Sequence, residues 1–209
     1  MTRVKICGVR SRHEARWAAE CGAWAVGEVF APSRRQITPE GAADINRFLG
    51  AGIVKIGVFV DEDLERVNRT ARDCGLDMVQ LHGGESPEYC RAVAVPVIKA
   101  FRPSRPVAVA ELERWPVRAC LFDAGSGQQY GGTGTTFNHE WIRELAGDPR
   151  LIVAGGLNPG NVGQVIRQLK PLAVDVSSGV EFPEGGKDPA LVKHFMQQVK
   201  EANSYASSA

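Results

Sequence analysis

The sequence has little net charge, few aromatic residues and no long apolar run. Its 209 residues include 25 Lys and Arg and 24 Asp and Glu, a formal net charge of +1, and aromatic residues make up 7%. This balance gives no electrostatic reason to expect nucleic acid or an anionic membrane as a partner. No apolar run approaches the roughly 18 residues of a membrane span, and charge appears too early for a signal peptide. We therefore expect a cytoplasmic protein with neither partner.

The five cysteines also lack a recognisable pattern. They stand at positions 7, 21, 74, 90 and 120, and no two have the spacing of a zinc or redox motif. We expect a reducing compartment, no metal site, and four small buried side chains at Cys21, Cys74, Cys90 and Cys120. Cys7 differs from these because it ends a predicted strand.

Short apolar runs alternate evenly with longer amphipathic ones along the chain. The runs predict eight strands, at residues 4–7, 25–30, 54–60, 78–82, 97–101, 119–123, 151–154 and 173–177. Helix starts are predicted between them at Ser11, Thr38-Pro39, Asp61/Glu62, Asn161 and Pro189.

Each predicted strand is followed by enough residues for a helical crossover, which indicates a parallel sheet. Eight such units favour the α/β class and a compact, single-domain (β/α)8 TIM barrel over residues 1–202, with residues 203–209 as a disordered tail. An open doubly wound sheet is the alternative.

Polar residues interrupt four of these apolar strands, at Lys5, Gln80, Lys99 and Asp175. An unpaired buried charge costs several kcal/mol, so each needs a partner or a ligand. Three share a strand face with a residue at the strand end, namely Cys7, His82 and Ser177. The polar faces therefore lead towards the carboxyl ends of the strands, where barrel enzymes bind their substrates. A purely structural polar layer is the alternative.

Glycine-rich turns follow the last two strands. One contains Gly155 and Gly156, and the other contains Ser178 and Gly179. Converging backbone N–H groups at such turns bind anions, and barrels commonly bind a substrate phosphate there. Simple tight turns are the alternative. The glycine-rich segment 124–136, which includes Gly132, is interpreted as a lid over the site, or else as a surface loop.

Few residues remain as candidates for chemistry. Cys7 and Asp123 end the first and sixth strands, where a thiol and a carboxyl group could act as an acid–base pair across a substrate. His82 also ends a strand, although a structural histidine is the alternative. The adjacent Arg34 and Arg35 could bind a substrate carboxylate, or be solvent-exposed.

Taken together, the chain resembles the phosphoribosylanthranilate isomerase family of barrel enzymes from tryptophan biosynthesis. The matching motifs lie in the family's order at residues 5–8, 25–27 with 29–30, 33–35 with 37–40, 57–60, 79–83, 122–123, 131–134 with 137, 154–159 with 161–162, 174–181 and 186–188. The resemblance implies an Amadori rearrangement of N-(5'-phosphoribosyl)anthranilate to 1-(2-carboxyphenylamino)-1-deoxyribulose 5-phosphate. No cofactor or metal is expected, and a phosphorylated small molecule is the expected partner. A monomer and a homodimer are both compatible with the sequence.

The resemblance also implies roles for individual residues. Asp123 would be the general acid, Cys7 the general base, and Arg35 the ligand of the anthranilate carboxylate. The two glycine turns, with Gly155, Gly156, Ser178 and Gly179, would bind the phosphate. From their places in the chain, we also expect His82 and Gly132 to contact the substrate and Lys5, Gln80 and Asp175 to support the site. A thiol has an ordinary pKa of about 8.5, so Cys7 needs a nearby cation, for which Lys5 is the candidate.

Three features depart from the family pattern: Glu28 within a strand, a shorter loop at 31–35, and Arg10 just after Cys7. We expect them near the carboxylate-binding region, where Arg10 could share the role of Arg35. The rivals are the histidine-pathway isomerase, which tends to have a carboxylate in place of Cys7, and a non-catalytic phosphate-binding barrel.

Overall fold

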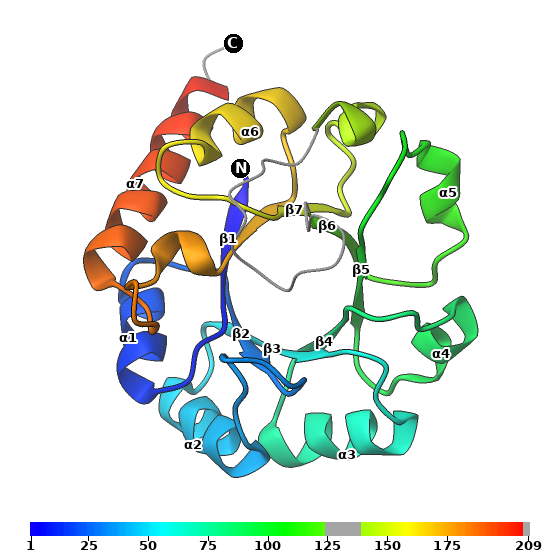
Figure 1. The fold of residues 1–209 in the computed structure, drawn as a ribbon, viewed down its shortest axis with the longest axis vertical. Helices are drawn as coiled ribbons and strands as arrows, with labels where there is room; N and C mark the ends of the chain where they lie inside the picture. Colours follow the sequence, from blue (N-terminus) through cyan, green and yellow to red (C-terminus); the bar gives the residue numbers. More distant parts are fainter. Residues whose placement is uncertain (124–138, 207–209) are drawn as a thin grey trace.

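Eight parallel strands form one closed barrel with helices around it, as predicted (Figure 1). The computed structural model describes residues 1–123 and 139–206. Each strand pairs with the next one, and β8 pairs with β1 to close the barrel. The strands are β1 (Arg3–Cys7), β2 (Ala25–Val29), β3 (Val54–Phe59), β4 (Met78–Leu81), β5 (Val97–Phe101), β6 (Ala119–Asp123), β7 (Leu151–Ala154) and β8 (Ala173–Val176).

The helices lie outside the strands. They are α1 (Arg12–Glu20), α2 (Pro39–Leu49), α3 (Leu64–Cys74), α4 (Pro87–Ala92), α5 (Val109–Glu113), α6 (Val162–Leu169) and α7 (Pro189–Ala206), with short 3₁₀ segments η1 (His139–Leu145) and η2 (Ser178–Val180). The segment interpreted as a lid, with Gly132, lies outside the described residues.

Hydroxyl and carboxylate caps determine where several helices begin. The Ser11 and Thr38 side chains accept hydrogen bonds from backbone N–H groups of the first turns of α1 and α2. The predicted start at Asp61/Glu62 is wrong by about two residues, because Asp63 caps α3. Asp61 instead has a positive φ of 48°, and its carboxylate accepts a hydrogen bond from Gly84 N at 2.6 Å.

The prediction of a disordered tail at residues 203–209 is wrong for residues 203–206. Helix α7 continues to Ala206, and the buried Asn203 side chain bonds both to the backbone N and to the backbone O of Thr2, at 2.8 and 2.9 Å. Asn203 thus satisfies both backbone groups of the buried Thr2, and this stabilises the last turn of α7 as helix. Residues 207–209 lie outside the described residues.

The two faces of the barrel wall contain different side chains. The lower interior is filled by aliphatic residues such as Ala25, Ile98 and Leu121, while a larger apolar layer lies between the strands and the helices. Lys99 belongs to the outer face, where its ammonium group lies 2.9 Å from the buried Glu85 carboxylate and bonds to the Gly83 carbonyl. Lys99 is therefore paired away from the barrel interior.

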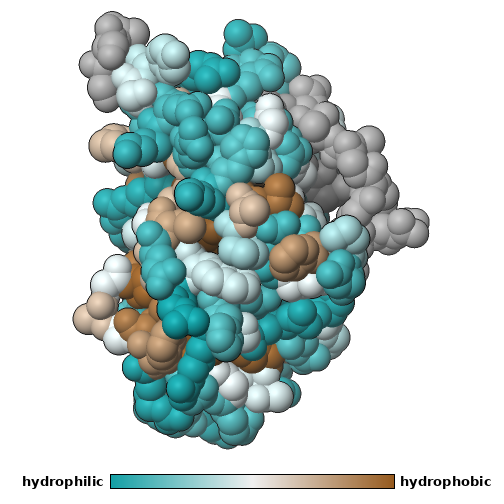
Figure 2. Space-filling view, turned by 90° about the vertical axis from the view of Figure 1, so that its left-hand side faces the viewer, coloured by the Kyte–Doolittle hydropathy of each residue, from teal (hydrophilic) through white to brown (hydrophobic). Residues whose placement is uncertain are grey.

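The face formed by α7 and α1, at the left of Figure 1, is mostly hydrophilic, with small separate groups of apolar side chains (Figure 2). Small patches of this kind are ordinary on a protein surface. Of the helices in the described ranges, none has the length and hydropathy needed to span a bilayer.

Glu28 points from β2 into the layer between the sheet and the helices, so the expectation that it lies near the carboxylate site is wrong. Its Oε2 accepts a hydrogen bond from Asn46 Nδ2 at 3.0 Å.

Glu28 Oε1 and Asn46 Oδ1 are buried acceptors that lack hydrogen-bond donors among the described residues. A proton on the carboxyl group would let Glu28 donate to Asn46. Burial raises the pKa of Glu28 to about 7, although the Asn46 hydrogen bond and the charge of Lys55 lower it.

This buried acid makes stability depend on pH. The folded protein binds the Glu28 proton more tightly than the unfolded chain does, so its contribution is full below the ordinary pKa and is lost as pH rises through about 7. Glu28→Gln supplies an amide donor without a charge. We expect urea unfolding at pH 8 to show a gain of up to about 3 kcal/mol in the free energy of unfolding.

The matched control is Glu113→Gln, at an exposed helical position. Between pH 5 and pH 8, the control should lose stability as the parent protein does, while Glu28→Gln should lose less. Equal losses in all three proteins would contradict a neutral Glu28.

Candidate active site

Cys7 lies at the carboxyl end of β1 on the interior face of the barrel. Its side chain is buried, and its carbonyl accepts a hydrogen bond from the Ser177 hydroxyl at 3.1 Å. Gly27 on β2 makes room for it: a Cβ there would lie 2.8 Å from Cys7 Sγ and 3.0 Å from Lys5 Nζ. The sulfur and the ammonium group therefore lie over the same glycine.

Lys5 and Asp175 form an ion pair inside the barrel. They are register partners on β1 and β8, and Lys5 Nζ lies 3.0 Å from Asp175 Oδ1, with the two side chains 0% and 9% exposed. Burial alone would lower the pKa of Lys5, but the charges of Asp175 and Cys7 hold it above its ordinary value. Lys5 is therefore a cation next to the thiol, as predicted.

The net effect on the thiol differs from the expectation. Burial raises the pKa of Cys7 above its ordinary value, and the charges of Lys5 and Lys187 offset this only in part because Asp175 opposes them. The raised pKa favours the thiol form of Cys7 at neutral pH.

Asp123, at the end of β6, lies close to His82. The His82 Nε2 atom is 3.4 Å from Asp123 Oδ2, and both side chains are partly exposed. On the other side of the ring, Gln80 Nε2 lies 3.1 Å from His82 Nδ1. When the Gln80 amide donates to Nδ1, the imidazole proton is on Nε2 and faces the Asp123 carboxyl group. The structure thus joins three predicted residues into one chain of contacts.

The barrel mouth is hollowed beside this chain. A depression of about 310 Å³ lies over the ends of β3, β4 and β5, and its lining consists of Val60, Asp61, His82, Gly83, Gly84, Ala100 and Arg102. His82 therefore lies between this depression and the Asp123 carboxyl group.

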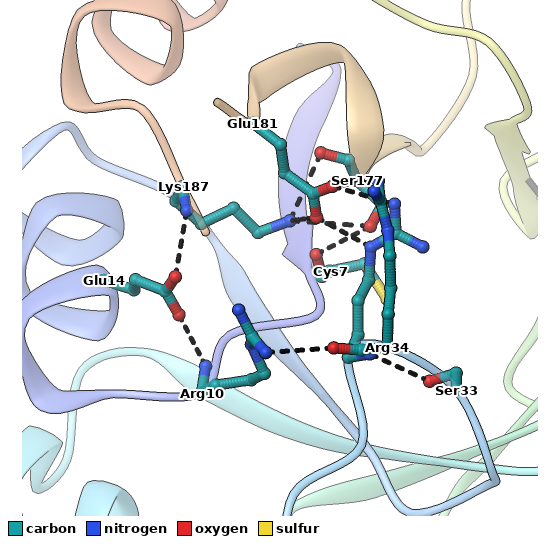
Figure 3. Close-up of polar contacts among 9 residues, drawn as sticks. Cys7, Arg10, Glu14, Ser33, Arg34, Ser177, Glu181 and Lys187 are labelled. Atoms are coloured by element: carbon teal, nitrogen blue, oxygen red, sulfur yellow. Dashed lines mark hydrogen bonds and ion pairs between the residues drawn. The ribbon is translucent and has the colours of Figure 1, made fainter. Parts of the chain in front are cut away.

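A cluster of charged side chains covers the other side of the mouth, above β1, β2 and β8 (Figure 3). Arg35 Nε and Nη2 donate to the two carboxylate oxygens of Glu181 at 2.7 and 2.8 Å, and Lys187 Nζ donates to the same carboxylate at 2.8 Å. Burial alone would raise the pKa of Glu181, but the hydrogen bonds from Arg35 and Lys187 lower it to about 2. Glu181 is therefore an anion that binds both Arg35 and Lys187.

Arg34 and Arg10 lie at the exposed rim of this cluster (Figure 3). Arg34 Nη2 donates to Glu181 at 2.7 Å, and Arg10 Nη1 donates to the Arg34 carbonyl at 2.9 Å. Glu14 accepts hydrogen bonds from the backbone N–H groups of Arg10 and Lys187. The cluster contains four cationic side chains and two carboxylates, so this side of the mouth is suited to an anion.

The two glycine-rich turns are in direct contact. Gly155 and Gly156 both have positive φ, at 87° and 66°, so the turn after β7 uses backbone that favours glycine. In the turn after β8, a Cβ on Gly179 would lie 1.9 Å from the Leu157 carbonyl oxygen. Only glycine permits this approach, which brings the predicted phosphate-binding residues of both turns together.

No role for Glu181 or Lys187 is predicted from the sequence, although the fold brings both to Arg35. The available signal was weak: both residues stand in the loop after β8, next to the predicted anion site, and Lys187 follows two glycines.

All five cysteines are free; Cys74, Cys90 and Cys120 are buried as predicted, whereas Cys21 is only half-buried. In residues 1–123 and 139–206, no three or more His, Cys, Asp or Glu side chains are grouped as metal ligands would be.

Comparison with known proteins gives a consistent result over nearly the whole chain. Residues 4–198 match the family described as N-(5'-phosphoribosyl)anthranilate (PRA) isomerase. The N-(5'-phosphoribosyl)anthranilate isomerase of Syntrophomonas wolfei subsp. wolfei is 55% identical over 201 residues, which cover 96% of this chain and 98% of that protein.

Solved structures agree. The phosphoribosyl anthranilate isomerase of Thermus thermophilus has a TM-score of 0.86 and 38% identity, covering 96% of this chain and 99% of that one. An isomerase of the same name, in complex with reduced 1-(o-carboxyphenylamino)-1-deoxyribulose 5-phosphate, has a TM-score of 0.79 and 38% identity, covering 96% and 100%. The chain belongs to the N-(5'-phosphoribosyl)anthranilate isomerase family.

Proposed function

We propose that this chain catalyses the Amadori rearrangement of N-(5'-phosphoribosyl)anthranilate to 1-(2-carboxyphenylamino)-1-deoxyribulose 5-phosphate in tryptophan biosynthesis. The observation that carries the proposal is that a thiol and a carboxyl group both end strands on the interior face of a barrel from this family. Cys7 ends β1 and Asp123 ends β6, with β7 and β8 between them on one side of the barrel. Five free thiols support a reducing compartment, and we propose the cytoplasm.

The charges and turns support one orientation of the substrate. The phosphate would bind the backbone N–H groups of the touching turns that contain Gly155, Gly156, Ser178 and Gly179. The anthranilate carboxylate would bind Arg35, whose stem lies against Gly8: a Cβ on Gly8 would be 2.5 Å from Arg35 Cδ. Because Gly8 follows Cys7, the carboxylate would then be anchored next to the base.

In the first step, Asp123 donates a proton to the furanose ring oxygen. The bond from C1' to that oxygen breaks, and the nitrogen lone pair forms a protonated Schiff base at C1'. The His82 imidazole positions the Asp123 carboxyl group and is itself held by Gln80. Removal of this proton donor would leave a poor alkoxide leaving group.

In the second step, the Cys7 thiolate removes the proton from C2', and the electron pair moves to the protonated imine to give an enolamine. Protonation at C1' and loss of the hydroxyl proton at C2' then give the aminoketose. The positive charge on nitrogen accepts the electrons, so C1' is reduced while C2' is oxidised within the same substrate molecule.

A rival isomerase that uses the histidine-pathway aminoaldose is disfavoured by Cys7, because that family tends to use a carboxylate there. The test is to add purified protein to freshly formed N-(5'-phosphoribosyl)anthranilate and follow the loss of its fluorescence, with the histidine-pathway substrate assayed in parallel. Turnover of the anthranilate compound is expected. Turnover of the other substrate alone, or of neither, would overturn the proposal.

Removal of either reacting group should abolish most of the rate. We expect Cys7→Ala and Asp123→Asn each to lower kcat by a factor of about 10² to 10⁴, since positioned acids and bases contribute on that scale. Fluorescence assays give kcat, and thermal unfolding checks the fold. Turnover near that of the parent protein in either folded variant would remove that residue from its role.

The raised pKa of Cys7 can be tested directly on the thiol. The thiolate absorbs in the ultraviolet, so the difference in absorbance between the parent protein and Cys7→Ala should rise with pH and keep rising beyond the ordinary thiol value of about 8.5. A titration between about pH 6 and pH 10 measures this, with circular dichroism at each pH as the control for folding. A profile that becomes level near pH 7 would show that the free protein already holds Cys7 as a thiolate.

A further inference from the structure

Glu181 occupies one edge of the Arg35 guanidinium group. The fork geometry uses Nε and Nη2, at 2.7 and 2.8 Å from the two carboxylate oxygens. No hydrogen bond within the described part of the chain engages Arg35 Nη1. A guanidinium group has five N–H donors, so a second edge, formed by Nη1 and the other Nη2 hydrogen, remains for a ligand.

Glu181 is itself fixed in place. Lys187 Nζ donates to Glu181 Oε1 at 2.8 Å and to the Ser177 carbonyl at 3.2 Å, and the Glu181 and Lys187 side chains are 4% and 1% exposed. Ser177 in turn donates to the Cys7 carbonyl. The carboxylate is thus held by a buried lysine that is anchored to the end of β8.

The Arg35 stem has little freedom of its own. It lies against Gly8, and the Arg35 side chain is only 19% exposed, compared with 57% for the Arg34 side chain. Because the stem is packed and one edge of the guanidinium group is bound to Glu181, the remaining edge can face in only one direction. Preorganisation of this kind lowers the conformational entropy lost when a charged ligand binds.

We propose that Glu181 is a positioning residue that presents the free edge of Arg35 to the anthranilate carboxylate, with Lys187 holding Glu181 in place. This inference rests on the proposed function, because it assigns the ligand of Arg35. Glu181 stays bound to Arg35 in the complex and makes no contact with the reacting carbons. Its loss therefore weakens substrate binding more than it slows the chemical step.

The test uses the full chain and freshly formed N-(5'-phosphoribosyl)anthranilate. Glu181→Gln removes the charge, and Glu181→Asp keeps the charge for Lys187 but withdraws the carboxylate from Arg35. Both should raise KM about tenfold, with kcat changed less than threefold. Glu184→Gln, at an exposed position of the same loop, is the matched control and should leave both constants unchanged.

A double-mutant cycle separates positioning from a general structural role. If Glu181 acts through Arg35, then adding Glu181→Gln to Arg35→Ala should change KM less than twofold. A tenfold further increase in that background, or an unchanged KM in folded Glu181→Asp, would overturn the inference. If the parent protein shows no turnover, the proposed function fails instead, so the two failures are distinguishable.

Discussion

The pairing of β8 with β1 is the constraint on which the site depends. It closes the barrel between two segments about 170 residues apart in the chain and puts Lys5 opposite Asp175 in register. A buried ion pair is stable only when both members are present, and removal of one leaves a costly unpaired charge. The same seam brings Ser177 to Cys7 and the loop of Glu181 and Lys187 to Arg35. Closure therefore brings Cys7 and the cationic cluster together in one step.

The mouth of the barrel has two sides with different chemistry. Over β1, β2 and β8, buried carboxylates hold lysine and arginine side chains around the thiol. Over β4 and β6, the contacts run from Gln80 through His82 to Asp123 beside an open depression. The acid and the base that we propose need opposite electrostatic surroundings, and Asp123 and Cys7 lie on separate strands in these two regions.

Much of the fold could be predicted from the sequence because it depends on local patterns. The apolar runs locate all eight strands to within a residue at each end, and Ser11, Thr38 and Pro189 mark helix starts correctly. One failure concerns a contact between distant residues, and another concerns which face of a strand a residue occupies. Asn203 keeps α7 helical through Thr2, at the opposite end of the chain. Glu28 lies beside Gly27 in sequence, but alternation along β2 turns it to the outer face, towards Asn46.

The candidate site, like the fold, could be predicted from the sequence only where local patterns indicate it. Residue types at strand ends indicated Cys7, Asp123 and the glycine turns, but no spacing connects Glu181 to Arg35, which is 146 residues away.

The most direct test is a crystal structure of the complex with reduced 1-(o-carboxyphenylamino)-1-deoxyribulose 5-phosphate. We predict the phosphate at the two glycine turns, the carboxylate on the free edge of Arg35 and the sugar carbons between Cys7 and Asp123. A carboxylate that displaces Glu181, or a phosphate in the depression beside His82, would contradict the account.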